Sequence, residues 1–258
     1  MNQDNKWIGL KRKVQNPKLR LFAFHYAGGG ASSFKKWTKD LIHHDSVEFY
    51  AIQLPGREKR VSEEAYTELN SLIQDLVEGL DPLLDKPFVL FGYSMGSIIA
   101  YELTLELLKR GGYEQKALMI GAQKAPIPRF PRKKRHHLSN EKIIEELKIL
   151  GGTSLEILEN EKFMEHYLKI FRADFAIVDN YMRDVSNKIQ FPLYVFGSIN
   201  DPEVSLEQLY SWRHYSKDIF ELKLYPGGHF FLDEHYELLM NDINEILEIL
   251  TEEKILII

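Results

Sequence analysis

One short stretch, G-Y-S-M-G at 92–96, constrains the fold of this chain more than any other. An apolar run at 87–92 leads into it, and residues 97–110 follow with the apolar spacing of a helix. The pattern G-x-S-x-G puts a serine on a sharp turn between a strand and a helix, where side chains in place of the glycines would collide with neighbouring backbone. The helix that begins there adds positive potential near the hydroxyl. This context favours Ser94 as a nucleophile over a serine that merely fills a turn.

Short apolar runs alternate with helical spacing along much of the chain. Strands are expected at 20–24, 47–54, 87–92, 117–122, 191–197 and 219–225, and several of these runs are apolar throughout, as in strands covered on both faces. Helices are expected at 32–42, 66–80, 97–110 and 235–254. This alternation predicts an α/β fold, with a mostly parallel central sheet flanked by helices. A chain of 258 residues is long enough to form it as one domain, 1–258.

The stretch 126–185 interrupts the alternation. It begins with the proline-rich, basic segment PIPRFPRKKRHH and continues with helical spacing and no candidate strand. Structureless loops of this length are rare in compact domains. We therefore interpret 126–185 as a helical lid inserted between two strands.

The composition excludes several kinds of site and partner. The chain has no cysteine, which rules out disulfides, thiolate metal sites and a cysteine nucleophile, and favours a reducing, cytoplasmic setting. Its net charge of −5 disfavours nucleic acid as a partner. No apolar run is long enough to cross a bilayer, and the polar first residues do not resemble a secretory signal, so no membrane association is expected.

A nucleophilic serine needs a base, and the base needs a group that orients it. In this fold the order along the chain is serine, acid, histidine. Asp201 follows the fifth expected strand and His229 follows the last one, so both fit that order with Ser94. Two rival acids fit less well, since Asp174 lies in the insertion and Asp233 follows the histidine. We interpret Asp174 as an anchor of the lid.

The glycine-rich stretch FHYAGGGAS, residues 24–32, follows the first expected strand. Acyl transfer to a serine requires preorganised N–H donors for the oxyanion, one from the residue after the nucleophile and one from a loop at this place in the chain. We assign these donors to the backbone amides of Met95 and Ala27. A phosphate-binding loop is the alternative, but the stretch lacks both the Lys-Ser/Thr ending of a P-loop and G-x-G-x-x-G spacing.

The residues around this loop are expected to line a substrate pocket. We assign that role to His25, Tyr26 and Gly28, with a structural role as the alternative for His25. The chemistry requires no metal or redox cofactor.

Seven segments together resemble a type II thioesterase, the external editing enzyme of nonribosomal peptide and polyketide assembly lines. They are FHYAGGGASSF, QLPGRE, FGYSMGS, LGGTSLEIL, FRADFAIVDNY, FGSINDPEV and YPGGHFFL, in family order over almost the whole chain. The resemblance implies an α/β-hydrolase fold with a helical lid. It also implies hydrolysis of acyl or aminoacyl groups from the 4′-phosphopantetheine arm of carrier domains, with Ser94, Asp201 and His229 as the triad. The expected partners are acyl or peptidyl carrier domains, and the protein is expected to be a monomer.

Two further segments allow more than one interpretation. In QLPGRE, Arg57 and Glu58 form either a surface ion pair or part of the pocket mouth. Five cations at 129–135 are either a solvated run or a surface that steers acidic carrier domains.

Two other functions remain open from the sequence. One is a free-standing esterase, lipase or peptidase with the same triad. The other is a catalytically idle protein of this fold that only binds a carrier.

Overall fold

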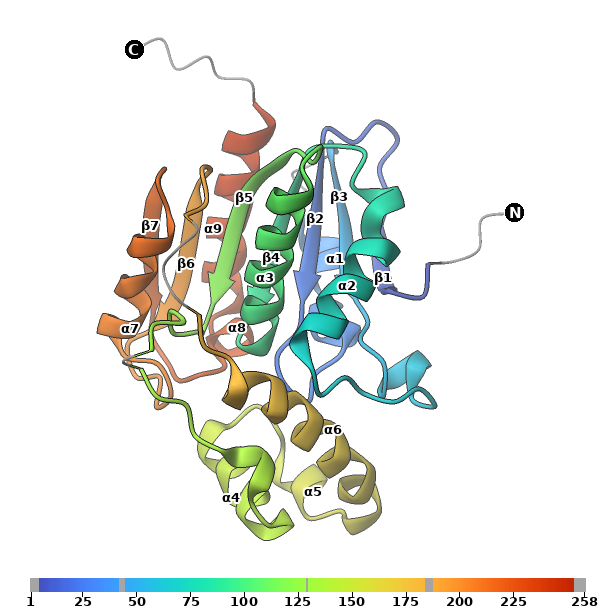
Figure 1. Cartoon of the computed structure of the whole chain (residues 1–258), viewed down its shortest axis with the longest axis vertical. Helices are drawn as coiled ribbons and strands as arrows, with labels where there is room; N and C mark the ends of the chain where they lie inside the picture. The colour runs from blue at the N-terminus through green and yellow to red at the C-terminus, as the bar shows by residue number, and fades with distance from the viewer. Residues whose placement is uncertain (1–4, 42–44, 129, 184–187, 253–258) are drawn as a thin grey trace.

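A computed structural model describes residues 5–41, 45–128, 130–183 and 188–252, which form a seven-stranded sheet covered by helices on both faces (Figure 1). The sheet order is β1-β3-β2-β4-β5-β6-β7, with β1 antiparallel to β3 and the other neighbours parallel. The strands are β1 Ile8–Arg12, β2 Leu19–Phe24, β3 Val47–Ile52, β4 Phe88–Tyr93, β5 Gln115–Gly121, β6 Leu193–Ser198 and β7 Phe220–Tyr225. The expected α/β fold is thereby confirmed.

The six expected strands correspond to β2–β7, and the sequence did not predict β1. Residues 8–12 read IGLKR, and four of the five are half-buried while one is exposed. Because β1 lies at the edge of the sheet, it carries neither a continuous apolar run nor a clean alternation.

The helices are α1 Trp37–Asp40, α2 Leu69–Leu80, α3 Met95–Arg110, α4 Asn140–Leu150, α5 Leu155–Leu158, α6 Glu161–Asn180, α7 Leu206–Tyr210, α8 Phe231–Glu234 and α9 Tyr236–Thr251. The expected helices at 66–80, 97–110 and 235–254 correspond to α2, α3 and α9, although residues 253 and 254 lie outside the described part. At 32–42 the expectation of one helix is wrong. A 3-10 turn at Ala31–Phe34 and the single turn α1 stand there, and residue 42 is not described.

Side chains that alternate along each strand enter two separate apolar cores. In β4, Leu90 belongs to the core beneath α2 and α3, whereas Val89 and Phe91 belong to the core beneath α1 and α9. Each fully buried large apolar side chain contributes about 2 kcal/mol. The two cores therefore fix β4 from both faces and give its carboxyl end a firm position.

The inserted helices α4, α5 and α6 lie between β5 and β6 in the chain and beyond the carboxyl ends of the strands (Figure 1). They have a small core of their own, formed by Ile143, Leu147, Leu158, Met164, Leu168, Phe171 and Phe175. Serine and asparagine side chains cap their N-termini, at Ser139, Ser154 and Asn160. Within 126–185 the described residues contain no strand, and residues 129, 184 and 185 are not described.

In the described part of the chain, none of the helices combines the length and the apolar character that crossing a bilayer requires.

Candidate active site

Ser94 stands at the turn between β4 and α3 in a strained backbone conformation. Its φ of 52° and ψ of −113° lie in a region that non-glycine residues seldom occupy. A Cβ on Gly92 would lie 2.2 Å from the carbonyl oxygen of Gly96, and one on Gly96 would lie 2.1 Å from that of Phe24. The crowding expected from G-x-S-x-G is therefore present, and both positions require glycine.

Three side chains distant in the chain meet at the carboxyl edge of the sheet. Nε2 of His229 lies 3.1 Å from Oγ of Ser94, and Nδ1 of His229 lies 2.8 Å from Oδ2 of Asp201. The side chains of His229 and Asp201 are 7% and 1% exposed. The hydroxyl, imidazole and carboxylate thus form one hydrogen-bonded series in the order that the sequence suggested.

The histidine and the acid are each held by a further hydrogen bond. Tyr93 Oη donates to the backbone carbonyl of His229 at 2.6 Å. Burial raises the pKa of Tyr93 well above its usual value, so that its hydroxyl keeps its proton. Oδ1 of Asp201 accepts the backbone N–H of Glu203 at 2.8 Å, which leaves Oδ2 for the imidazole.

The rival acids lie elsewhere. Asp233 is in α8, and burial raises the pKa of its carboxyl. Asp174 is in α6 and accepts hydrogen bonds from Arg57 and from the backbone of Gly28. The described residues show neither of them bonded to His229.

The two backbone amides assigned to the oxyanion belong to the residue after Ser94 and to a residue that lines the same cavity as Ser94. Met95 is the first residue of α3, where backbone N–H groups have no partner within the helix. Ala27 lines the cavity beside Ser94, and its N–H has no hydrogen-bond acceptor among the described residues. Tyr26 O accepts the N–H of Gly29 at 3.0 Å, which makes this loop a tight turn.

A buried ion pair links the loop after β3, which carries Arg57, to the inserted helices. Arg57 Nη1 and Nη2 lie 2.6 and 2.9 Å from the two carboxylate oxygens of Asp174, and the side chains are 3% and 2% exposed. Arg57 is therefore not paired with Glu58 at the surface, as one interpretation of QLPGRE had it. Glu58 instead accepts hydrogen bonds from Ser32. The anchoring role expected of Asp174 agrees with this contact, but nothing in the sequence indicated that Arg57 is its partner.

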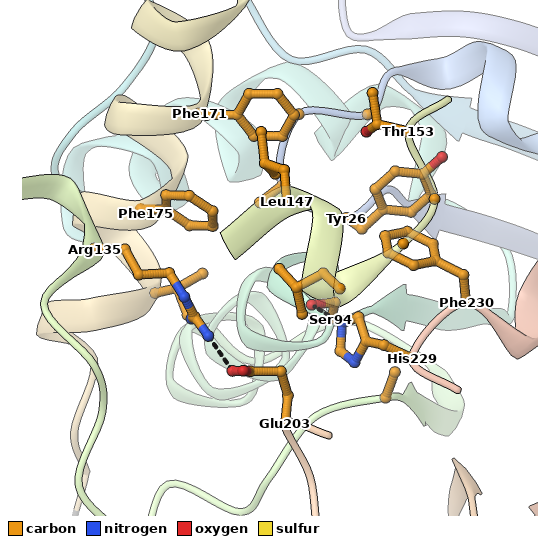
Figure 2. Close-up of a pocket in the computed structure, with 18 of the residues that line it drawn as sticks. Tyr26, Ser94, Arg135, Leu147, Thr153, Phe171, Phe175, Glu203, His229 and Phe230 are labelled. Carbon is orange, nitrogen blue, oxygen red and sulfur yellow. Dashed lines mark hydrogen bonds and ion pairs between the residues drawn. The ribbon is translucent and has the colours of Figure 1, made fainter. Parts of the chain in front are cut away.

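A cavity of about 240 Å³ opens over Ser94 and His229 (Figure 2). The sheet domain contributes Tyr26, Ala27, Gly28 and Phe230 to it, among others. The insertion contributes a largely apolar wall that includes Leu147, Ile157, Met164, Tyr167, Phe171 and Phe175. Figure 2 shows Leu147, Phe171 and Phe175 across the cavity from Ser94 and His229. The wall is suited to an apolar part of a ligand.

Of the three expected pocket residues, Tyr26 and Gly28 line the cavity and His25 does not. The His25 ring is buried behind the loop, at 1% exposure, where its Nδ1–H donates to the carbonyl of Tyr26 at 2.8 Å. Burial lowers the pKa of His25 to about 4, and the positive charge of Arg57 adds to that effect. His25 is thus a neutral, supporting residue at ordinary pH.

In the basic segment at 129–135 two of the four described cations pair with carboxylates of the same chain, whereas Arg132 and Lys134 bond to carbonyl oxygens; the first cation, Arg129, lies outside the described residues. Lys133 and Arg135 both form ion pairs with Glu146 of α4 and Glu203 of the loop after β6. The Arg135–Glu203 pair lies at the cavity wall in Figure 2. These cations therefore join the insertion to the loop that carries Asp201, a role that neither interpretation of the run included.

Comparison with known proteins gives consistent matches over most of the chain. The sequence profile of the Thioesterase domain matches residues 19–247. The gramicidin S biosynthesis protein GrsT of Aneurinibacillus migulanus is 35% identical over 240 residues, which cover 93% of each chain. The solved structure of the type II thioesterase BorB, from the borrelidin biosynthetic cluster, has a TM-score of 0.83 and 26% identity over 96% of this chain and 100% of that one. The RedJ thioesterase of the prodiginine pathway in Streptomyces coelicolor has a TM-score of 0.83 and 29% identity over 89% and 90%.

Proposed function

The chain belongs to the thioesterase family, and we propose that it acts as a type II thioesterase that hydrolyses acyl or aminoacyl thioesters on the 4′-phosphopantetheine arm of carrier domains. Such a reaction would regenerate misprimed carriers of a nonribosomal peptide or polyketide synthase. The observation that carries the proposal is the hydrogen-bonded series Ser94, His229 and Asp201 at the base of a cavity with an apolar wall.

In the first half-reaction, His229 Nε2 takes the proton of the Ser94 hydroxyl as Oγ attacks the thioester carbonyl. Asp201 accepts the Nδ1–H and so fixes the tautomer that leaves Nε2 free to accept a proton. The bond from carbonyl carbon to sulfur then breaks. The imidazolium returns its proton to the departing pantetheine sulfur, and an acyl-serine remains.

In the second half-reaction, His229 takes a proton from a water molecule, whose oxygen attacks the acyl-serine. The Ser94 ester bond breaks, Oγ regains the proton from the imidazolium, and a free carboxylic acid leaves. The backbone amides of Met95 and Ala27 bind the oxyanion in both halves. Loss of one such donor typically costs about 3–4 kcal/mol of transition-state stabilisation.

The inserted helices supply the acyl-binding wall, and we assign them the role of a lid over the site. Their apolar residues face Ser94 across the cavity, whereas Arg135 and Glu203 lie at its polar side. We propose that a monomer receives the arm of an acyl or peptidyl carrier domain. Steering of an acidic carrier by the segment 130–135 stays a prediction.

The test is mass spectrometry of carrier domains loaded with acetyl, longer acyl and aminoacyl groups, each incubated with the protein. We expect acyl groups to be released by the wild type, and release by Ser94→Ala to be lower by a factor of about 10⁴ or more. Ser211→Ala serves as the control, because this buried serine, at the end of α7, donates its hydroxyl to the carbonyl of Glu207 and does not line the cavity.

The outcomes separate this function from the two rivals. Hydrolysis of simple esters or amides without release from carriers would indicate a free-standing esterase or peptidase. Carrier binding with no labelling of Ser94 by a fluorophosphonate would indicate an idle binding protein.

A further inference from the structure

One face of α6 contacts the glycine-rich loop at Gly28. Gly28 has a φ of +76°, and a Cβ there would lie 2.0 Å from a ring carbon of Phe171. Its backbone N–H donates to Oδ2 of Asp174 at 2.7 Å. Phe171 and Asp174 are three residues apart on α6, so they project from the same side of the helix. The inserted helix therefore supports the loop both by packing and by a charge-assisted hydrogen bond.

Arg57, from the loop after β3, holds the glycine-rich loop through further hydrogen bonds. Besides its two bonds to Asp174, it donates through Nη1 to the carbonyl of Gly29 at 3.3 Å and through Nε to that of Pro55 at 3.1 Å. The guanidinium and the carboxylate together hold the N–H of Gly28 and the C=O of Gly29. Two consecutive residues of the loop are thus fixed directly after Ala27.

The energetics argue against a purely stabilising role. A buried ion pair contributes little net stability, because taking two charges out of water costs about as much as their attraction returns. An apolar pair of similar size would fasten α6 to the sheet domain at least as well. It would, however, offer no acceptor to the N–H of Gly28 and no donor to the C=O of Gly29.

We propose that Asp174, oriented by Arg57, is a positioning residue for the oxyanion site. It holds the peptide after Ala27 so that the Ala27 amide presents its N–H beside Ser94. Since Asp174 belongs to the inserted helix, the oxyanion site is complete only when α6 is seated on the loop. This inference rests on the proposed serine hydrolase chemistry, and it adds that the seating of the lid and the formation of the second oxyanion donor are one event.

The structure offers a matched control. Glu102 of α3 is also a nearly buried acid, at 8% exposure, and it accepts hydrogen bonds from Tyr181 Oη and Arg183 Nη1, both at 2.7 Å. It therefore fastens the end of the insertion to the sheet domain, as Asp174 does, but it touches neither the glycine-rich loop nor the cavity. Glu102→Gln weakens lid attachment without altering the oxyanion loop.

The experiment compares Asp174→Asn with Glu102→Gln by hydrolysis of a p-nitrophenyl acyl ester and by inhibition with an alkylboronic acid. The boronate forms a tetrahedral adduct on the serine, with one oxygen at the oxyanion position. For Asp174→Asn we expect kcat to fall by a factor of about 10–100 with KM changed less than about twofold, because only the transition state uses the misplaced donor. The boronate inhibition constant should rise by a similar factor. Glu102→Gln should keep kcat within about twofold, whatever its melting temperature.

A double variant tests whether a loss of activity comes from unfolding. Arg57→Met with Asp174→Leu replaces both buried charges by apolar side chains, and we expect it to melt above either single variant while keeping the low kcat. Wild-type kcat in a folded Asp174→Asn or double variant would overturn the proposal, as would an equal loss of kcat in Glu102→Gln.

The ester assay also separates this inference from the proposed function. An ester-active wild type that releases nothing from carriers would refute the carrier substrate and leave the role of Asp174 to be decided by its own kinetics.

Discussion

Nδ1 of His229 lies 2.8 Å from Oδ2 of Asp201, at a place where the carboxylate side chain is only 1% exposed. The contact determines which imidazole nitrogen carries the proton. With Asp201 as acceptor, Nδ1 is the donor, and Nε2 can take the proton from Ser94.

Asp201→Asn should therefore inactivate the enzyme without unfolding it. An asparagine amide that donates to Nδ1 favours the tautomer with its proton on Nε2, which cannot act as a base toward Ser94. We expect kcat to fall by a factor of about 10⁴ with an unchanged melting temperature, as measured by ester hydrolysis and thermal unfolding. Asp218→Asn, in the loop before β7, is the control. Wild-type turnover in Asp201→Asn would show that another group orients the histidine.

Gly96→Ala should destabilise the turn at the nucleophile. The new methyl group would lie 2.1 Å from the carbonyl oxygen of Phe24, so that α3 or β2 must move. We expect the free energy of unfolding to fall by about 3 kcal/mol, at the upper end for overpacking. Gly228→Ala is the comparison, because a Cβ there meets no atom within 4 Å. Equal unfolding curves for the two variants would contradict the crowding argument.

The buried histidine predicts a loss of stability in mild acid. Burial, aided by Arg57 and opposed by Asp174, lowers the pKa of His25 from its ordinary 6.5 to about 4. Between these values the unfolded chain binds a proton that the native protein does not, so stability rises with pH in this window. The contribution of His25 is complete above about pH 6.5 and is lost as the pH falls toward 4, by roughly 3 kcal/mol.

His25→Phe keeps a ring of similar size and removes this titration. We expect denaturant unfolding of the variant between pH 4 and 6.5 to depend less steeply on pH than that of the wild type. Parallel pH profiles would mean that the pKa of His25 is the same in the folded and the unfolded chain.

Arg135→Gln should lower the free energy of unfolding by much more than the loss of a solvated surface cation would. Its guanidinium is 7% exposed and pairs with Glu146 and Glu203, so the variant leaves two partly buried carboxylates without this partner. We expect the free energy of unfolding to fall by about 3 kcal/mol. Lys109→Gln breaks a pair in which the lysine is 79% exposed and should cost less than about 0.5 kcal/mol. Similar losses in chemical denaturation would refute the distinction.

The sequence predicted most of the fold because two signals agreed. Apolar runs found β2–β7, and of these β2, β3, β4 and β6 are buried at every residue. The strained turn at Ser94 could be anticipated from two glycines. The edge strand β1 has no such run. The helix expected at 32–42 failed because Ala31, Phe34 and Trp37 pack into the core from a 3-10 turn and a short helix.

Site residues could be predicted where their position along the chain identifies them. They could not be predicted where their role depends on a contact between distant parts of the chain. Ser94 follows from the G-x-S-x-G motif, and Asp201 and His229 follow from the order of the strands that precede them. The pairing of Arg57 with Asp174 joins residues 117 positions apart, and nothing near either residue indicates the other. The basic run likewise suggested a solvated or docking segment, because its glutamate partners lie in α4 and after β6.

Tyr93 connects the nucleophile and the base through the end of β4. It is the last residue of β4 and the neighbour of Ser94, and its hydroxyl holds the carbonyl of His229. Nucleophile and base therefore share one support. We expect a displacement of the end of that strand to carry both groups in the same direction, so that the distance between Oγ of Ser94 and Nε2 of His229 changes less than the positions of the surrounding loops.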